Sequence, residues 1–183
     1  MVQQKRKSPR LKDYDYSTSG AYFITICAKD RKCLFSNIVG AIHESPENKL
    51  TQYGEFVKQI IEILPNRFNV SIPKYVIMPN HIHLIIEFYN DDEKRAIRES
   101  PLQCYHSIID KAVGFLKMNV SKKIHKTYSG VIWQRSYHDH IIRGEKDYQK
   151  IWEYIDTNIL RWEKDCFYND WYNFLFSCEL NLK

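Results

Sequence analysis

The stretch "MPNHIHLII", residues 78–86, decides how this chain is interpreted. A proline followed by an asparagine is typical of a tight turn, and the aliphatic residues after them are typical of a buried strand. Side chains alternate between the two faces of a strand, so the aliphatic residues at even positions share the face that packs in the core. His81 and His83 share the opposite face, side by side and directly after the turn.

Two imidazoles in this arrangement suggest a metal site. Histidine nitrogens are the commonest metal ligands in proteins, and a spacing of two residues lets His81 and His83 converge on one ion. The pair alone is weak evidence, because one histidine can be structural while the other faces solvent. A metal site therefore needs a further ligand or a catalytic group from another element.

The rest of the chain predicts alternating strands and helices. Pro65 is expected to end the first helix, and residues 29–48 suit a hairpin or loop. The strands are expected at 21–28, 70–78, 81–89 and 131–144, and the helices at 51–64, 101–124 and 145–165. This order is the βαββαβ pattern of a ferredoxin-like (RRM-like) α+β fold, with one antiparallel sheet and helices on one face.

Length and composition indicate one domain in the cytoplasm. The chain has 183 residues and a net charge of +5, which permits a nucleic-acid partner without requiring one. Its five cysteines are an odd number without CxxC spacing, so free thiols are expected. The apolar runs are too short to cross a membrane. The predicted divisions are a basic arm at 1–19, the domain at 20–165, and an aromatic extension at 166–183 that packs on the domain.

The third predicted helix supplies candidates for the missing groups. Tyr154 and Asn158 are four residues apart and share one helical face, although a tyrosine beside an apolar stripe is more often a packing residue. A phenol, two imidazoles and an amide oxygen together can perform metal-assisted phosphoryl transfer. Such a ligand set suits Mg²⁺ or Mn²⁺, of which Mn²⁺ tolerates nitrogen better.

Several other residues are weaker candidates. Tyr137 and Tyr148 are rival nucleophiles, and His140 is a candidate extra ligand or a group that supports a ligand. Arg135 and Arg143 are candidates for holding DNA phosphates. For each, a solvated charge or a cross-strand pair is an equally good interpretation.

The N-terminal stretch "KRKSPRLK", residues 5–12, is a candidate DNA-backbone clamp. Its basic residues include Lys5, Arg6 and Arg10. A solubilising tail is the competing interpretation of the same composition.

Four stretches in order carry a family resemblance: "YDYSTSGAYFITICAKDRKCLF" (14–35), "VIMPNHIHLII" (76–86), "IWQRSYHDHIIR" (132–143) and "YIDTNILRW" (154–162). Together they resemble the REP-associated tyrosine transposases, relatives of the single-tyrosine HUH transposases of bacterial insertion sequences. The resemblance runs from about Pro9 to Asp165. It implies an HUH nuclease fold and cleavage of single-stranded DNA at or near a hairpin. The implied intermediate is a covalent 5′-phosphotyrosine with a free 3′-OH, and joining is the reverse attack.

The resemblance also assigns roles to individual residues. It implies that His81 and His83 are the HUH histidines, that Tyr154 is the nucleophile, and that Asn158 completes the divalent metal site. The partner would be hairpin-bearing single-stranded DNA, bound by a monomer or a homodimer. One departure is that members often have Asn-Pro where this chain has Asn158 followed by isoleucine. Without the proline, the third helix is expected to continue to about Lys164.

Two functions of other classes remain open at this stage. The same sheet fold serves nucleic-acid recognition, so a degenerate transposase could bind hairpins without cleaving them. A metal-dependent hydrolase of small phosphate esters would use the same ligands but would form no DNA adduct.

Overall fold

The computed structural model describes residues 20–40, 46–88 and 108–168. The predicted basic arm, including Lys5, Arg6 and Arg10, lies outside the described residues, as does most of the predicted C-terminal extension. Four strands form one sheet in the order β4-β5-β1-β6, and all its neighbouring strands are antiparallel. They are β1 Gly20–Cys27, β4 Ser71–Ile77, β5 His81–Phe88 and β6 His138–Ile142. With one helix after β1 and another after β5, this is the predicted ferredoxin-like α+β fold.

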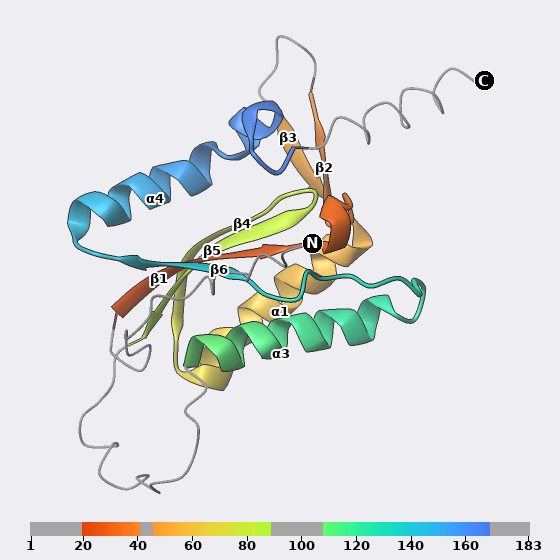
Figure 1. Cartoon of the computed structure of the whole chain (residues 1–183), viewed down its shortest axis with the longest axis horizontal. Coiled ribbons are helices and arrows are strands. Elements are labelled where there is room, and N and C mark those ends of the chain that lie inside the picture. The colour runs from red at the N-terminus through yellow and green to blue at the C-terminus, as the bar shows by residue number, and fades with distance from the viewer. Residues whose placement is uncertain (1–19, 41–45, 89–107, 169–183) are drawn as a thin grey trace, which may run out of the picture.

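The expected helical layer covers one face of the sheet (Figure 1). It consists of α1 Gln52–Phe68 and α3 Ile108–Ile124, which pack against each other and against the even-numbered aliphatic residues of β5. The main core therefore lies between this layer and the sheet.

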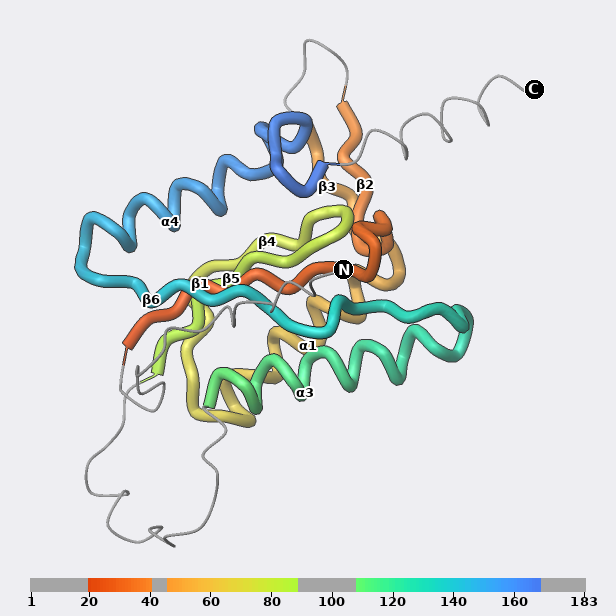
Figure 2. The backbone as a smooth tube through the Cα atoms, in the orientation of Figure 1, coloured from red at the N-terminus to blue at the C-terminus, as the bar shows by residue number. Residues whose placement is uncertain are grey.

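A third helix, α4 Glu145–Thr157, lies over the opposite face, and the backbone trace shows it returning across the sheet after β6 (Figures 1 and 2). The prediction that the helices cover one face of the sheet is therefore correct for α1 and α3 but wrong for α4. Beneath α4 is a smaller core of Val76, Met78, Ile85, Ile151, Ile155 and Trp162. The face that carries the two histidines is consequently a second buried layer, and not an exposed surface.

Two predicted helix ends differ from the structure. Pro65 does not end α1, which continues to Phe68 and stops at Asn69 in the left-handed region (φ 52°). A proline this near the end of a helix removes one hydrogen bond, and the last turn still packs on the core through Phe68. The third helix is α-helical only to Thr157, and a 3-10 helix, η2 Ile159–Lys164, then continues to the predicted end.

A small hairpin, β2 Ser36–Val39 and β3 Glu47–Leu50, forms a separate two-stranded sheet, which begins in the segment 29–48 and ends two residues beyond it. Ser36 Oγ and Asn48 Nδ2 both donate to the Ile77 carbonyl, at 3.2 and 2.8 Å. These bonds hold the hairpin at the end of β4, beside the turn that leads to the histidines.

Within the segment predicted as a strand over 131–144, only β6 is a strand, although Trp133 forms an isolated antiparallel bridge with Ala28 just after β1. Before β6, Lys117 Nζ donates to the carbonyls of Gln134 (2.5 Å) and Ser136 (3.2 Å). The Ser136 carbonyl is therefore bonded to a lysine side chain and not to a neighbouring strand. Within the described part of the chain, no helix combines the length and apolar character needed to cross a bilayer.

Candidate functional site

His81 and His83 lie adjacent on β5 with their ring centroids 4.5 Å apart, and both side chains are almost fully buried. His83 Nδ1 lies 2.8 Å from Thr25 Oγ1 on the neighbouring strand β1. His81 Nδ1 lies 2.9 Å from Asn80 Oδ1. Each ring therefore has its Nδ1 engaged, which fixes its orientation and leaves Nε2 for another partner.

The orientation of the Asn80 amide decides the tautomer of His81. Asn80 Nδ2 donates to the carbonyls of Phe167 (2.7 Å) and Arg31 (3.3 Å), so its Oδ1 must face the imidazole. An amide oxygen only accepts, so His81 carries its proton on Nδ1 and a lone pair on Nε2. That Nε2 is buried and finds no hydrogen-bond partner among the described residues. A buried acceptor of this kind is costly unless something binds it.

The end of α4 places the predicted tyrosine and asparagine against the histidines. Tyr154 Oη lies 3.3 Å from His83 Nε2, and its ring packs edge-on against His83. Asn158 is buried at the end of α4 with helical backbone angles, so the spacing of one turn from Tyr154 is kept. Its Oδ1, like His81 Nε2, is one of four buried side-chain atoms that lack a partner within the described ranges, and the other two, Asn48 Oδ1 and Asp139 Oδ1, belong to β3 and β6. The residues present therefore fit a bound cation.

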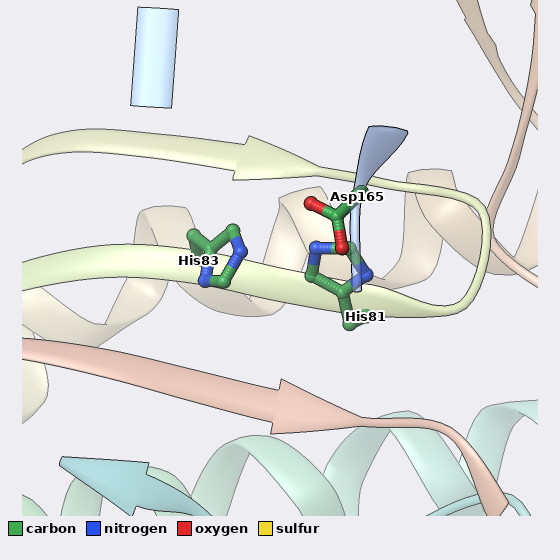
Figure 3. Close-up of side chains that lie close together, drawn as sticks. All are labelled: His81, His83 and Asp165. Atoms are coloured by element: carbon green, nitrogen blue, oxygen red, sulfur yellow. The ribbon is translucent and has the colours of Figure 1, made fainter. Parts of the chain in front are cut away.

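Asp165, at the end of η2, is a site residue that the sequence analysis missed. Its carboxylate and the two imidazoles offer ligand atoms within 4.8 Å of one another, a group that could hold a metal ion (Figure 3). Asp165 Oδ2 accepts from Tyr154 Oη at 3.4 Å and from Asn158 Nδ2 at 3.3 Å, and Oδ1 accepts from the Phe167 backbone at 2.7 Å. The carboxylate therefore bonds Tyr154 and Asn158 and lies close to both imidazoles.

Burial sets the protonation states. It lowers the pKa of His81 to about 3, with a smaller contribution from the Arg31 charge, and it holds the pKa of His83 well below the usual value. Both rings are therefore neutral at pH 7, which is the form that binds metals. Burial and then the Asp165 charge raise the pKa of Tyr154 to about 12, so the phenol is a weak nucleophile until its anion is stabilised.

The histidines should make the fold sensitive to acid. Above the usual pKa of 6.5 they are neutral in both the folded and the unfolded chain, and they add no pH dependence. Below pH 6.5 the histidines of the unfolded chain become protonated, whereas those of the folded protein stay neutral. His81 stays neutral in the folded protein down to about pH 3, where its pKa lies. The free energy of unfolding should fall by up to about 1.4 kcal/mol per pH unit for each histidine.

Urea denaturation in EDTA between pH 7 and pH 4.5 measures this slope. His81→Gln should make this slope shallower. An identical slope in His81→Gln and the parent would contradict the assigned cause.

Removal of the amide that orients His81 should weaken metal binding. Asn80→Ala leaves the imidazole without its acceptor, and the loss of such a supporting group typically lowers metal affinity about 10- to 100-fold. Calorimetric titration with Mn²⁺ measures the change. Asn48→Ala, which removes an amide that bonds only the Ile77 carbonyl in the nearby hairpin, is the matched control and should keep the parental affinity.

No family model matches the sequence. An uncharacterized protein of Haemophilus influenzae (strain ATCC 51907 / DSM 11121 / KW20 / Rd) is 38% identical over 174 residues, 90% of this chain and 94% of that protein. A second protein of the same strain, named "Putative REP-associated tyrosine transposase", is 27% identical over 144 residues, 79% of this chain and 72% of that protein. The chain is therefore related in sequence to a protein named as a REP-associated tyrosine transposase.

A comparison of folds also finds a REP-associated tyrosine transposase. The solved structure of a REP-associated tyrosine transposase bound to a REP hairpin matches with a TM-score of 0.57 at 18% identity, over 88% of this chain and 74% of that chain. This similarity supports the HUH transposase fold. The sequence similarity to a named transposase relates the chain to DNA-processing enzymes.

The two rival tyrosines make no contact with the histidines among those that the described residues show. Tyr137 Oη donates to Asp110 of α3 at 2.9 Å, and its ring packs with the main core on the other side of the sheet. Tyr148 stacks on Trp152 within α4, with ring centroids 5.9 Å apart. Of the three tyrosines considered from the sequence, Tyr154 is the one placed beside His83.

The remaining candidates lie along β6. His140 faces the same side of the sheet as the site, but its Nε2 pairs with Asp147 Oδ2 at 2.9 Å and makes no bond to the other histidines. Arg135 and Arg143 are exposed and flank β6. The register places Arg135 at the end of the sheet that carries His81 and Arg143 at the opposite end. The two arginines therefore cannot hold the same phosphate.

Proposed function

We propose that this protein is a metal-dependent endonuclease and strand transferase that acts in the cytoplasm on single-stranded DNA at hairpin-forming repeats. One observation carries the proposal: Tyr154 Oη lies 3.3 Å from Nε2 of a neutral, buried histidine, within a group that could hold a metal. A protein that only bound hairpins would have no use for two buried acceptors without partners. The family relationship supports the same class of reaction.

The metal would be held by Nε2 of His81 and His83, with Asn158 Oδ1 and Asp165 as the candidates that complete the site. Nitrogen and oxygen ligands in this mixture suit Mn²⁺ or Mg²⁺. When bound, the ion polarises a phosphate oxygen and stabilises the charge that develops as the phosphodiester is attacked.

The protein's own residues would perform the transfer. Tyr154 Oη attacks the phosphorus and forms a phosphotyrosine with the 5′ phosphate, while the bond from phosphorus to the 3′ oxygen breaks. The phenol loses its proton, and the departing oxygen gains one to become a free 3′-OH. Joining reverses these changes with another 3′-OH as the nucleophile. The predicted domain, residues 20–165, would contain every group that this reaction uses.

Basic residues outside the site would hold the strand. The structural relative is bound to a REP hairpin, which supports a hairpin-bearing strand as the partner here, bound by a monomer or a homodimer. Arg135 would contact phosphates near the cleavage site, and Arg143 would contact phosphates farther along the strand. Lys5, Arg6 and Arg10 of the basic arm would add contacts to the backbone, and affinity should fall as salt rises.

The proposal is tested with hairpin-bearing single strands labelled at the 5′ or the 3′ end. The protein is incubated with each strand and Mn²⁺, and the products are separated on a denaturing protein gel. With Mn²⁺ the 3′ label should move with the protein, and EDTA should prevent this shift. The 5′ label should stay on free DNA in both conditions. Tight binding without an adduct would favour the hairpin-binding function instead.

A further inference from the structure

The turn after β1 has an unusual backbone. Asp30 and Arg31 both adopt the left-handed region, with φ of 56° and 54°. Residues other than glycine are uncommon there, and aspartate is tolerated better than arginine. Strained residues of this kind concentrate at functional sites, which makes the side chain at position 31 a candidate for a role in binding.

This turn is fastened to the histidine site. Cys27, the last residue of β1, pairs with His81 on β5. Ala28 N donates to the Asn80 carbonyl at 2.8 Å, and Asn80 Nδ2 donates to the Arg31 carbonyl at 3.3 Å. The same asparagine therefore orients His81 and holds the turn, so residue 31 has a fixed place at the rim of the site.

The Arg31 side chain extends along that rim. One of its nitrogens, Nη1, donates to the Cys166 carbonyl at 2.9 Å, and its guanidinium carbon lies 5.6 Å from the centroid of the Phe167 ring. That ring lies 4.6 Å from the His81 ring.

Within the described ranges, Arg31 makes no ion pair, whereas its neighbour Lys29 is paired with Asp30 at 2.7 Å. A guanidinium has five N–H donors, and its fork matches the oxygens of a phosphate. An exposed guanidinium beside a site for phosphodiester chemistry has both the charge and the donors to hold the substrate.

We propose that Arg31 binds a DNA phosphate at the cleavage site, held there by the left-handed turn at residues 30–31. The proposal rests on the proposed function, because it takes single-stranded DNA as the ligand. Arg31 would fix the strand beside the histidines and Tyr154, and its charge would offset the negative charge that develops during attack.

Binding is tested separately from chemistry. Fluorescence anisotropy of a labelled hairpin-bearing strand is measured over a salt series, in EDTA and in a Tyr154→Phe background. The salt slope is the steepness with which the logarithm of the affinity falls as the logarithm of the salt concentration rises. Arg31→Gln keeps a donor for the Cys166 carbonyl but removes the charge. It should lower the salt slope by about 0.7, the value for one phosphate contact on a single strand. Arg31→Lys should keep the slope. Lys29→Gln, which removes a charge already paired in the same turn, is the matched control and should change it less.

Stability and cleavage complete the test. Arg31→Gly should lower the salt slope by the same amount as Arg31→Gln. Its melting temperature should stay at or above that of the parent, because glycine fits the left-handed backbone. In the protein that keeps Tyr154, with Mn²⁺ present, Arg31→Gln should slow single-turnover cleavage about 10- to 100-fold. An Arg31→Gln slope equal to that of its background, or an unchanged cleavage rate, would overturn the assignment.

The two proposals fail in different ways. A lower slope for Arg31→Gln in a protein that never forms an adduct would support the phosphate contact and contradict the proposed cleavage. A covalent adduct together with an unchanged salt slope for Arg31→Gln would support the proposed cleavage and contradict the phosphate contact. A parent that binds no strand would overturn both.

Discussion

Tyr154→Phe should abolish the covalent DNA adduct and slow metal-dependent cleavage at least about 1,000-fold, since removal of a nucleophile costs the whole covalent pathway. Phenylalanine keeps the ring that packs edge-on against Phe23 and His83 and removes only the hydroxyl. The hydrogen bonds lost are long, 3.3 Å to His83 and 3.4 Å to Asp165, so the free energy of unfolding should change by no more than about 1 kcal/mol. The measurement is a single-turnover assay with a denaturing gel, alongside a urea denaturation.

Tyr148→Phe and Tyr137→Phe are the matched controls, and both should form the adduct at the parental rate. Tyr137→Phe removes the bond to Asp110, so a loss of stability without a loss of adduct is expected for that variant. An adduct that persists in Tyr154→Phe and disappears in one of the other two would assign the nucleophile elsewhere and contradict the proposed geometry.

The sheet could be predicted because its strands have strong local signals. The alternation in residues 78–86 fixed which residues of β5 face the main core, and the structure buries Ile82, Leu84 and Ile86 completely. The turn before β5 also forms as expected, with Met78 N bonded to the His81 carbonyl at 2.9 Å. These features depend on neighbouring residues, so the sequence carries them directly.

The second buried layer was harder to predict, because it depends on where α4 packs. The apolar stripe of residues 145–165 predicts a core face of Ile151, Ile155, Ile159 and Trp162, and all of these are buried except Ile159, which is half-buried. It did not specify the surface that buries them. Ile85, an apolar residue on the histidine face of β5, was the available signal that this face is also covered.

The supporting groups of the site had weaker signals still. Asp165 lies beside the histidines directly after η2, a 3-10 helix that the sequence pattern did not distinguish from a continued α-helix. Thr25 comes from another strand, and its contact with His83 follows from the β1–β5 register. Asn80 was predicted only as a turn residue, although its place beside His81 in the sequence was a signal that it could orient the ring.

His81→Ala and His83→Ala should each abolish the stabilisation of the protein by Mn²⁺. A ligand that binds only the folded state at 100 times its dissociation constant raises the free energy of unfolding by about 2.7 kcal/mol, which shifts the melting temperature by several degrees. Each variant removes one Nε2 from a site where, among the described residues, the His81 atom has no other partner. Thermal unfolding with and without Mn²⁺ measures the shift. His140→Ala, which removes an imidazole paired with Asp147, should keep it.

The same titration separates the two ways to complete the metal site. If Asn158 Oδ1 is the ligand, Asn158→Ala should reduce the shift strongly, and Asp165→Asn should reduce it less because an amide oxygen remains near Tyr154. If Asp165 is the ligand, Asp165→Asn should have the larger effect, since the charge of a carboxylate is lost from the ion. Parental shifts in both histidine variants would contradict the metal site itself, because the other two residues bring no nitrogen ligand to replace an imidazole.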